Sequence, residues 1–292
     1  MVRLHLSWLV TIVVMMTVVP SIRADCAAVH PKCYYRNLGI SCNDLGHISQ
    51  VPKISHSGSV CLGLKITGNT TLSTIQTGAF NGLKVGTLIL TSIGITAIQS
   101  GAFSDLSDTL EHLYLNDNEL KTLPEDSFDG LGQLMALYLG KNNLKTLPDD
   151  IFNDLPHLRL LFLGSNGLKT LKTAWFRHLT NLQYIDLRKN EFETIPENAF
   201  EGLNHLRGLW LSQNRLKTLS YALVQNKPNL DSLALYGNPL ACDCRLAWVR
   251  TMADKLRGFT PLCASPPLIK GTRVVAYDIS MCAATSTETG MS

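Results

Sequence analysis

The stretch Leu110–Leu131 reads LEHLYLNDNELKTLPEDSFDGL, and its leucines fit neither the 3.6-residue period of a helix nor the plain alternation of a strand. They stand at Leu110, Leu113, Leu115, Leu120 and Leu123. The same frame restarts every 24 residues, at Leu110, Leu134, Leu158, Leu182, Leu206 and Leu230. A fixed period of this length indicates that similar coils stack into a solenoid.

Two further positions recur in phase with the leucines, and the frame reads LxxLxLxxNxLxxLPxxxFxxL. The ninth position holds Asn118, Asn142, Asn166, Asn190, Asn214 and Asn238. The nineteenth position holds Phe128, Phe152, Phe176 and Phe200, with Val224 in the last full repeat. Two looser repeats begin earlier, at Val85 and Cys61, with Ile93 and Asn69 at their ninth positions.

The frame resembles the leucine-rich repeat, and the resemblance covers nearly all of the chain beyond its first 24 residues. It implies an α/β leucine-rich repeat solenoid, a curved right-handed horseshoe with a parallel sheet on its concave side and disulfide-bonded caps at both ends. The LxL segment is a short strand whose leucines face the core, because strand side chains alternate. We expect the asparagine amides to bond backbone groups at the turn that follows, and the phenylalanines to fill the far side of each coil.

The ends of the chain predict a secreted protein. Residues 1–24 combine Arg3, an apolar run and a small-residue region ending at Ala24, which is typical of a signal peptide. Residues 25–60 then form an N-terminal cysteine-rich cap, 61–229 seven repeats, 230–282 a C-terminal cysteine-rich cap and 283–292 a short polar tail. No hydrophobic tail follows Cys282, so no membrane anchor is expected, and the near-neutral charge left after the leader argues against nucleic acid.

Eight cysteines lie in two groups of four, one near each end, which in a secreted chain favours disulfides. The segment from Asn238 to Arg250, NPLACDCRLAWVR, resembles the C-terminal cap of extracellular leucine-rich repeat proteins, which implies Cys242–Cys263 and Cys244–Cys282. A zinc site at Cys242 and Cys244 is an alternative, but one intervening residue is tighter than the usual ligand spacing. Trp248 and Leu246, at helical spacing, are expected in the core.

The N-terminal cap also resembles the family, with GISC followed by VPKI, but Pro31 stands where a CxC pair is usual. The resemblance implies Cys26–Cys33, and it leaves Cys42 without its usual partner. Cys61 is the available replacement, giving Cys42–Cys61, although four cysteines permit three pairings.

The fifth position of each coil lies between two buried leucines and must point out from the concave face. From repeat to repeat it holds Lys65, Ile89, Tyr114, Tyr138, Phe162, Asp186, Trp210 and Ala234. Outward aromatics are typical of interface hot spots, although rings that only shield the sheet are the alternative. The predicted ligand-binding residues are His112, Tyr114, Asn116, Asp117, Tyr138, Phe162, Tyr184, Asp186, Arg188, Trp210 and Tyr236.

Two other features have structural and functional interpretations. The twelfth position holds Lys121, Lys145, Lys169 and Lys217, interrupted by Glu193, and forms either a solvated edge or a site for an anionic glycan. Asn69 lies in the glycosylation sequence Asn-Thr-Thr and also at a ladder position, where burial favours the structural role.

The sequence favours recognition over catalysis. It contains no nucleophile elbow, phosphate loop or HExxH motif, and no cofactor or metal is expected. The caps and concave columns resemble the variable lymphocyte receptors of jawless vertebrates, which implies a secreted, extracellular, monomeric protein that binds a protein or glycan ligand, with a microbial surface antigen in immunity as the candidate. The alternative is a matrix or guidance protein, similar to small leucine-rich proteoglycans, that binds matrix proteins or sulfated glycans.

Overall fold

The structure is a computed structural model that describes residues 33–36, 39–43, 45, 61–68, 72–258 and 260–276. Several expectations fall outside these residues: the signal peptide at 1–24, Cys26, Asn69, Cys282 and the tail at 283–292.

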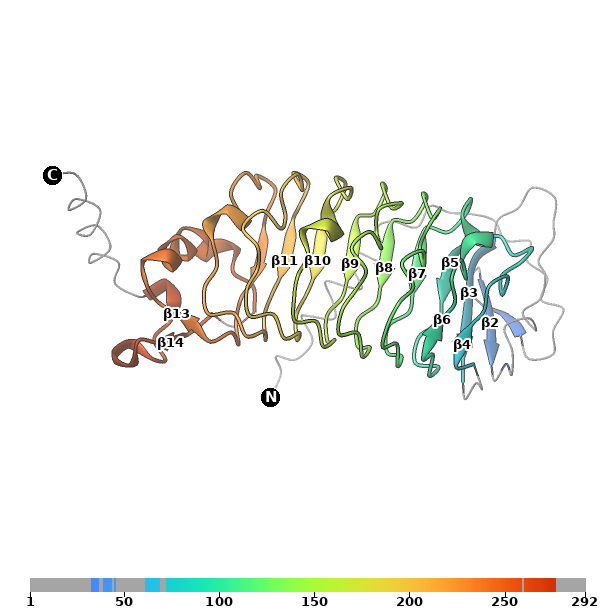
Figure 1. Ribbon diagram of the computed structural model, residues 1–292, viewed down its shortest axis with the longest axis horizontal. Helices are drawn as coiled ribbons and strands as arrows, with labels where there is room; N and C mark the ends of the chain where they lie inside the picture. Colours follow the sequence, from blue (N-terminus) through green and yellow to red (C-terminus); the bar gives the residue numbers. More distant parts are fainter. Residues whose placement is uncertain are drawn as a thin grey trace.

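A ten-stranded sheet runs along the solenoid (Figure 1). It begins with an antiparallel hairpin of β1 (Cys33–Arg36) and β2 (Gly39–Asn43). Every later neighbour pairs in parallel, in the order β3 (Cys61–Thr67), β5 (Val85–Ile89), β7 (His112–Tyr114), β8 (Ala136–Tyr138), β9 (Leu160–Phe162), β10 (Tyr184–Asp186), β11 (Gly208–Trp210) and β12 (Ser232–Ala234). Leu113 pairs with Leu137 and Leu137 with Leu161, so equivalent repeat positions lie side by side.

Short elements complete the coils. Strands β4 (Thr74–Ile75) and β6 (Ala97–Ile98) form a small parallel sheet, and 3₁₀ turns occur at η2 (Ser104–Leu106), η3 (Thr173–Phe176) and η4 (Tyr221–Leu223). In the described repeats the return segments hold these turns and no α-helix. A 24-residue coil leaves too few residues, after its strand and turns, for a helix of several stable turns.

The core is a continuous stack of the repeat leucines and phenylalanines. Leu113 and Leu115 are fully buried, as are their counterparts in the following coils. Phe128 is 1% exposed, and its ring stacks between Phe103 and Phe152 with centroids 6.3 and 6.2 Å away. Each coil therefore buries its apolar side chains against the coils on both sides.

The asparagine ladder predicted from the ninth position is present. In Asn142 the Oδ1 atom accepts from the Leu120 backbone N–H at 3.0 Å, and Nδ2 donates to the carbonyls of Leu115 and Leu139, each at 3.0 Å. The same bonds recur along the stack at Asn118, Asn166, Asn190, Asn214 and Asn238. Since each amide joins two coils, the ladder satisfies backbone groups that the turn leaves unpaired.

The C-terminal cap closes the last coil. It contains β13 (Leu240–Ala241), η5 (Cys244–Lys255), β14 (Cys263–Ser265), η6 (Pro267–Ile269) and η7 (Val274–Ala276). Arg257 N–H donates to the Leu233 carbonyl at 2.8 Å, which covers part of the free edge of β12. Leu246 is buried and the Trp248 indole donates to the Leu219 carbonyl at 3.1 Å, so both belong to the cap interior as expected.

A disulfide joins Cys242 to Cys263, which is the pairing that the C-terminal cap implied. Cys244 is disulfide-bonded as well. The zinc alternative is therefore wrong, because a zinc site requires free thiolates. None of the described helices is long and apolar enough to cross a bilayer.

The strand register contradicts the expected Cys42–Cys61 disulfide. Cys42 pairs with Ile66 in the parallel ladder, which puts Cys61 five residues, or roughly 16 Å, farther along β3. Disulfides require Cα atoms within about 7 Å. Cys33 instead lies directly opposite Cys42 in the hairpin, and such antiparallel partners have Cα atoms about 4.5–5.5 Å apart.

We therefore expect the disulfide of Cys42 to involve Cys33, leaving Cys26 for Cys61. Cys42 is buried and disulfide-bonded in the structure. Proteolysis without reduction, followed by mass spectrometry, should recover one linked peptide pair containing Cys33 and Cys42 and another containing Cys26 and Cys61. Recovery of Cys42 linked to Cys61 would contradict the pairing of Cys42 with Ile66 between β2 and β3.

Candidate functional site

The fifth-position side chains form one continuous column on the open face of the sheet, which is the face opposite the leucine core. The strand register pairs Tyr114 with Tyr138, Tyr138 with Phe162, Phe162 with Asp186 and Asp186 with Trp210. We call the four aromatic members, Tyr114, Tyr138, Phe162 and Trp210, the aromatic stripe.

Three rings of the aromatic stripe stack face to face. The centroids of Tyr114 and Tyr138 are 4.3 Å apart and those of Tyr138 and Phe162 are 4.7 Å apart, with interplanar angles of 9° and 5°. Tyr138, in the middle, is only 8% exposed, whereas Tyr114 and Phe162 are half-buried. The stack therefore shields much of its own surface, and its outer members offer most of the accessible ring area.

Burial keeps the two tyrosines neutral. Burial raises the pKa of Tyr114, although the hydrogen bond with Tyr138 partly opposes this rise. The pKa of Tyr138 is raised by burial and further by the charge of, and the hydrogen bond to, Tyr114. The pair therefore presents rings and neutral hydroxyls rather than an ionised group that could act as a base near neutral pH.

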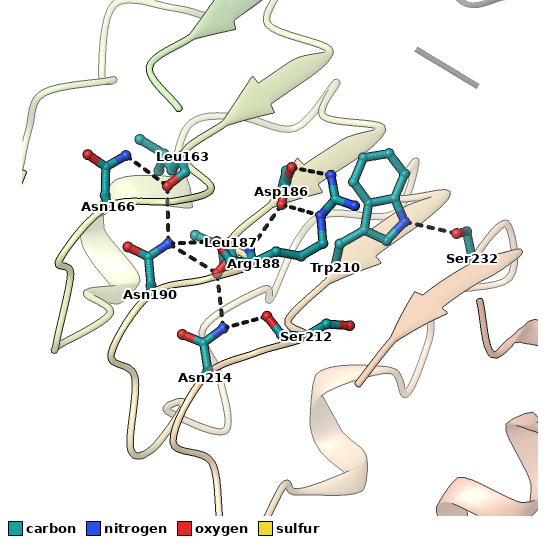
Figure 2. Close-up of polar contacts among 10 residues, drawn as sticks. All are labelled: Leu163, Asn166, Asp186, Leu187, Arg188, Asn190, Trp210, Ser212, Asn214 and Ser232. Atoms are coloured by element: carbon teal, nitrogen blue, oxygen red, sulfur yellow. Dashed lines mark hydrogen bonds and ion pairs between the residues drawn. The ribbon is translucent and has the colours of Figure 1, made fainter. Parts of the chain in front are cut away.

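The column position between Phe162 and Trp210 is Asp186, which forms an ion pair with Arg188. Figure 2 shows this pair beside Trp210. The Asp186 carboxylate accepts two hydrogen bonds from the Arg188 guanidinium, from Nε at 2.9 Å and from an Nη atom at 2.7 Å. It also accepts from the Arg188 backbone N–H at 2.9 Å. The guanidinium carbon lies 5.0 Å from the Trp210 ring centroid, within the range of a cation–π contact.

Asp186 is consequently paired with Arg188 and is not a free acceptor for a ligand. Asp186 is 7% exposed, and both of its carboxylate oxygens accept hydrogen bonds from Arg188. Burial of Arg188 lowers the pKa of its guanidinium, but the hydrogen bond and charge of Asp186 outweigh this and raise the pKa overall. Asp186 acts as a positioning residue for Arg188, and Arg188 and Trp210 are the groups left for a ligand.

Two more contacts fix the Trp210 ring. Its indole Nε1–H donates to Ser232 Oγ at 2.9 Å, as Figure 2 shows. The Tyr184 ring lies against the Trp210 ring, with ring centroids 6.1 Å apart. Gly208 leaves room for that tyrosine, because a Cβ atom at Gly208 would lie 2.5 Å from Tyr184 Cδ1.

Polar residues border the aromatic stripe at its N-terminal end. Asp117 accepts from Lys141 Nζ at 2.7 Å and from Asn116 Nδ2 at 2.6 Å, so it too is already paired. His112, in β7, is half-buried, and burial lowers its pKa more than the nearby Glu111 raises it. His112 is therefore neutral near pH 7 and can donate or accept a hydrogen bond.

Asp117 also belongs to the backbone turn that ends each strand segment. The eighth position of each coil has positive φ, with 59° at Asp117 and 52° at Lys141. Non-glycine residues adopt this conformation infrequently, yet the whole column does so: Ser92, Asp117, Lys141, Ser165, Lys189, Gln213 and Gly237. The turn directs the chain away from the sheet at the same point in every coil.

Comparison with known proteins agrees with this geometry. The family profile described as leucine rich repeat matches residues 84–144, 132–192 and 180–240, together more than half of the chain. The chain belongs to the leucine-rich repeat family. No curated protein sequence matches it. Among solved structures, the present protein is similar to human 5T4 (Wnt-activated inhibitory factor 1, trophoblast glycoprotein), with a TM-score of 0.68 and 23% sequence identity. The match covers 87% of this chain and 96% of the 5T4 chain.

The structure of this leucine-rich repeat protein unites most of the predicted site residues on one face. The set that follows the strand register comprises His112, Tyr114, Tyr138, Phe162, Tyr184, Asp186 and Trp210, with Asn116, Asp117 and Arg188 directly after their strands. Tyr236 lies at the cap end, where a Cβ atom at Gly258 would be 2.9 Å from its ring.

Three further residues, which are not among the predicted ligand-binding residues, contribute to the site. Lys141 and Ser232 bond Asp117 and Trp210, and both lie one 24-residue repeat or nearly so from their partners. Gly164 is the third: a Cβ atom there would lie 3.0 Å from the Asp186 carboxylate. The repeat frame could have identified these contacts, since residues at equivalent positions of adjacent coils lie side by side.

Proposed function

We propose that this protein binds a protein partner through the open face of the sheet, with Tyr114, Phe162, Arg188 and Trp210 as the main contacts. The supporting observation is that the Trp210 ring is held by Ser232 and Arg188 while it remains partly exposed. Tryptophan, tyrosine and arginine dominate the binding energy of protein interfaces. Rings that are fixed before binding lose little conformational entropy when a partner arrives.

The proposal includes an extracellular location and recognition of a microbial surface antigen. The Cys242–Cys263 disulfide supports the first point, because structural disulfides persist in oxidising compartments. The resemblance of the caps and sheet columns to variable lymphocyte receptors supports the second. Preorganised aromatic side chains bordered by small and polar residues are also typical of antibody paratopes.

A sulfated glycan is the second candidate, and a different surface favours it. Lys121, Lys145, Lys169 and Lys217 are all exposed, at equivalent positions of the coils. None of the four forms an ion pair with a described residue. Binding through this column should weaken steeply with salt, whereas binding anchored by the aromatic stripe should depend little on salt.

The proposed function predicts a strong effect of Trp210→Ala. A panel of extracellular proteins and bacterial surface preparations would first be screened with the purified chain to obtain a ligand. We then expect Trp210→Ala and Tyr114→Ala each to weaken binding by roughly 10- to 100-fold, because both remove anchor rings. Biolayer interferometry measures the change.

Leu268→Ser provides the matched control, since Leu268 lies in the C-terminal cap, outside the sheet, and is 97% exposed. It should leave binding unchanged. Tyr138→Ala is a poor probe, because Tyr138 is buried between two rings and its loss would also lower stability. Unaltered binding by both Trp210→Ala and Tyr114→Ala would rule out the aromatic stripe as the binding surface.

A further inference from the structure

A cleft of about 560 Å³ opens where the last repeat meets the C-terminal cap. One wall comes from η4 and the turn after it, and the other from the end of η5. Its lining residues are Asn204, Tyr221, Val224, Asn226, Lys227, Pro228, Met252 and Lys255. All eight lie outside the ten-stranded sheet, so this cleft is separate from the aromatic stripe.

Lys227 supplies one of the two cations that line the cleft. The residue is only 8% exposed, and its ammonium group forms no hydrogen bond or ion pair with any residue in the described part of the chain. Burial lowers its pKa, and the charge of Glu201 opposes this only in part. Its stem is covered by neighbouring residues, while the ammonium group itself still reaches solvent in the cleft, as is usual for a lysine. An anion in the cleft would supply the missing partner.

A second cation faces the same space. Lys255, at the end of η5, lines the cleft and is half-exposed. It forms no ion pair with a described residue either. Two lysines on opposite walls can hold one anionic group between them, which attracts it more strongly than either alone.

The remaining lining groups favour a sugar ring as the carrier of that anion. Tyr221 is 49% exposed, and its ring is fixed against Trp248 with centroids 5.9 Å apart. An exposed, immobile ring offers a flat apolar surface for the C–H face of a sugar. The exposed Asn204 and Asn226 carry amides that can bond hydroxyl groups, and the cleft volume is within the usual range for small ligands.

We propose that this cleft binds an acidic sugar, with the carboxylate or sulfate group between Lys227 and Lys255 and the ring on Tyr221. The neighbouring coils beneath the cleft are tied together by Asn229 Nδ2, which donates to the Asn204 carbonyl at 3.2 Å. The binding surface therefore forms with the fold and does not require the ligand to order it.

Calorimetric titration of the full chain tests this proposal with three probes: methyl β-D-glucuronide, glucose 6-sulfate and methyl β-D-glucoside. We expect at least one of the acidic probes to bind, and the neutral glucoside to bind at least about tenfold more weakly. Comparison of the two acidic probes distinguishes a carboxylate ligand from a sulfate ligand. Equal binding of all three probes, or no binding by any, would overturn the proposal.

Variants separate the cleft from other cationic surfaces. Lys227→Met keeps the buried stem but removes the charge, and should weaken acidic-sugar binding about tenfold or more. Tyr221→Ala and Lys255→Met, both at less buried positions, should each weaken binding as well. Lys84→Met is the matched control, because Lys84 is an exposed lysine that belongs neither to the cleft nor to the lysine column, and Trp210→Ala should also bind acidic sugar normally.

The surface variants keep the test informative if Lys227→Met does not fold. Circular dichroism would show whether Lys227→Met is folded. Wild-type affinity in folded Tyr221→Ala and Lys255→Met would contradict the proposed site. If no acidic sugar binds the cleft but Trp210→Ala still weakens partner binding, the cleft proposal is wrong and the proposed function of the sheet is unaffected.

Discussion

Phe128→Ala should destabilise the solenoid by about 3–5 kcal/mol, the largest effect expected of a single substitution in this chain. Phe128 is 1% exposed, and its ring is stacked on both sides by the equivalent phenylalanines of adjacent coils. Removing it deletes the ring contacts of two coil boundaries and leaves a cavity that the flanking backbone can fill only in part. Urea unfolding followed by circular dichroism measures the loss.

Phe128→Leu is the control for this substitution, because leucine refills most of the space without the stacking geometry. We expect it to cost about half as much or less. Equal losses for alanine and leucine would indicate that ring stacking, and not filled volume, stabilises this side of the coils. A loss below about 1 kcal/mol for Phe128→Ala would contradict the packing described above.

Asn142→Ala should destabilise the chain by about 2–4 kcal/mol. The amide of Asn142 satisfies the Leu120 N–H and two carbonyls, and the residue is 7% exposed. With alanine, these backbone groups stay buried without partners, and the cost of their lost hydration is not recovered. Thermal or urea unfolding with matched probes gives the difference in free energy.

Asn143→Ala is the matched control, since Asn143 is the next residue and its side chain is exposed. Its backbone N–H bonds the Leu120 carbonyl and would be unaffected by the substitution. We expect a change of less than about 0.5 kcal/mol. Asn142→Asp adds a further comparison, because a carboxylate can accept from Leu120 but cannot donate to the two carbonyls. Equal stability of Asn142→Ala and Asn143→Ala would show that the ladder contributes nothing.

The sequence predicts which residues lie on the open face of the sheet, but not which of their side chains are free to contact a ligand. The alternation at Tyr114 requires its side chain to stand opposite the leucine core, and the strand register agrees. Whether a side chain is then free depends on residues one coil away. Tyr138 is covered by its neighbours in the stack, and Asp186 is bonded by Arg188. Such side-chain contacts depend on rotamers and local charge, which the repeat pattern does not predict.

In the N-terminal cap, the sequence did not predict even which residues lie next to each other. Its four cysteines permit three pairings; the family resemblance implied Cys26–Cys33, and Cys61 was then the available partner for Cys42. Only the structure shows that Cys33 faces Cys42 across the hairpin and that, in the β2–β3 register, Cys61 is too far along β3. Register across strands is set by the joint packing of the cap and the first coil, which the spacing of cysteines in the sequence does not report.

The sequence by itself determined the solenoid, the ladder and the phenylalanine stack, because a strict 24-residue period forces equivalent residues into contact in every coil. The tertiary structure alone decided which outward side chains are paired and which are free, and how the last repeat and the cap form a cleft around Lys227. The physical reason is that periodic contacts repeat along the chain, whereas the cleft joins η4 to η5 through packing that occurs only once.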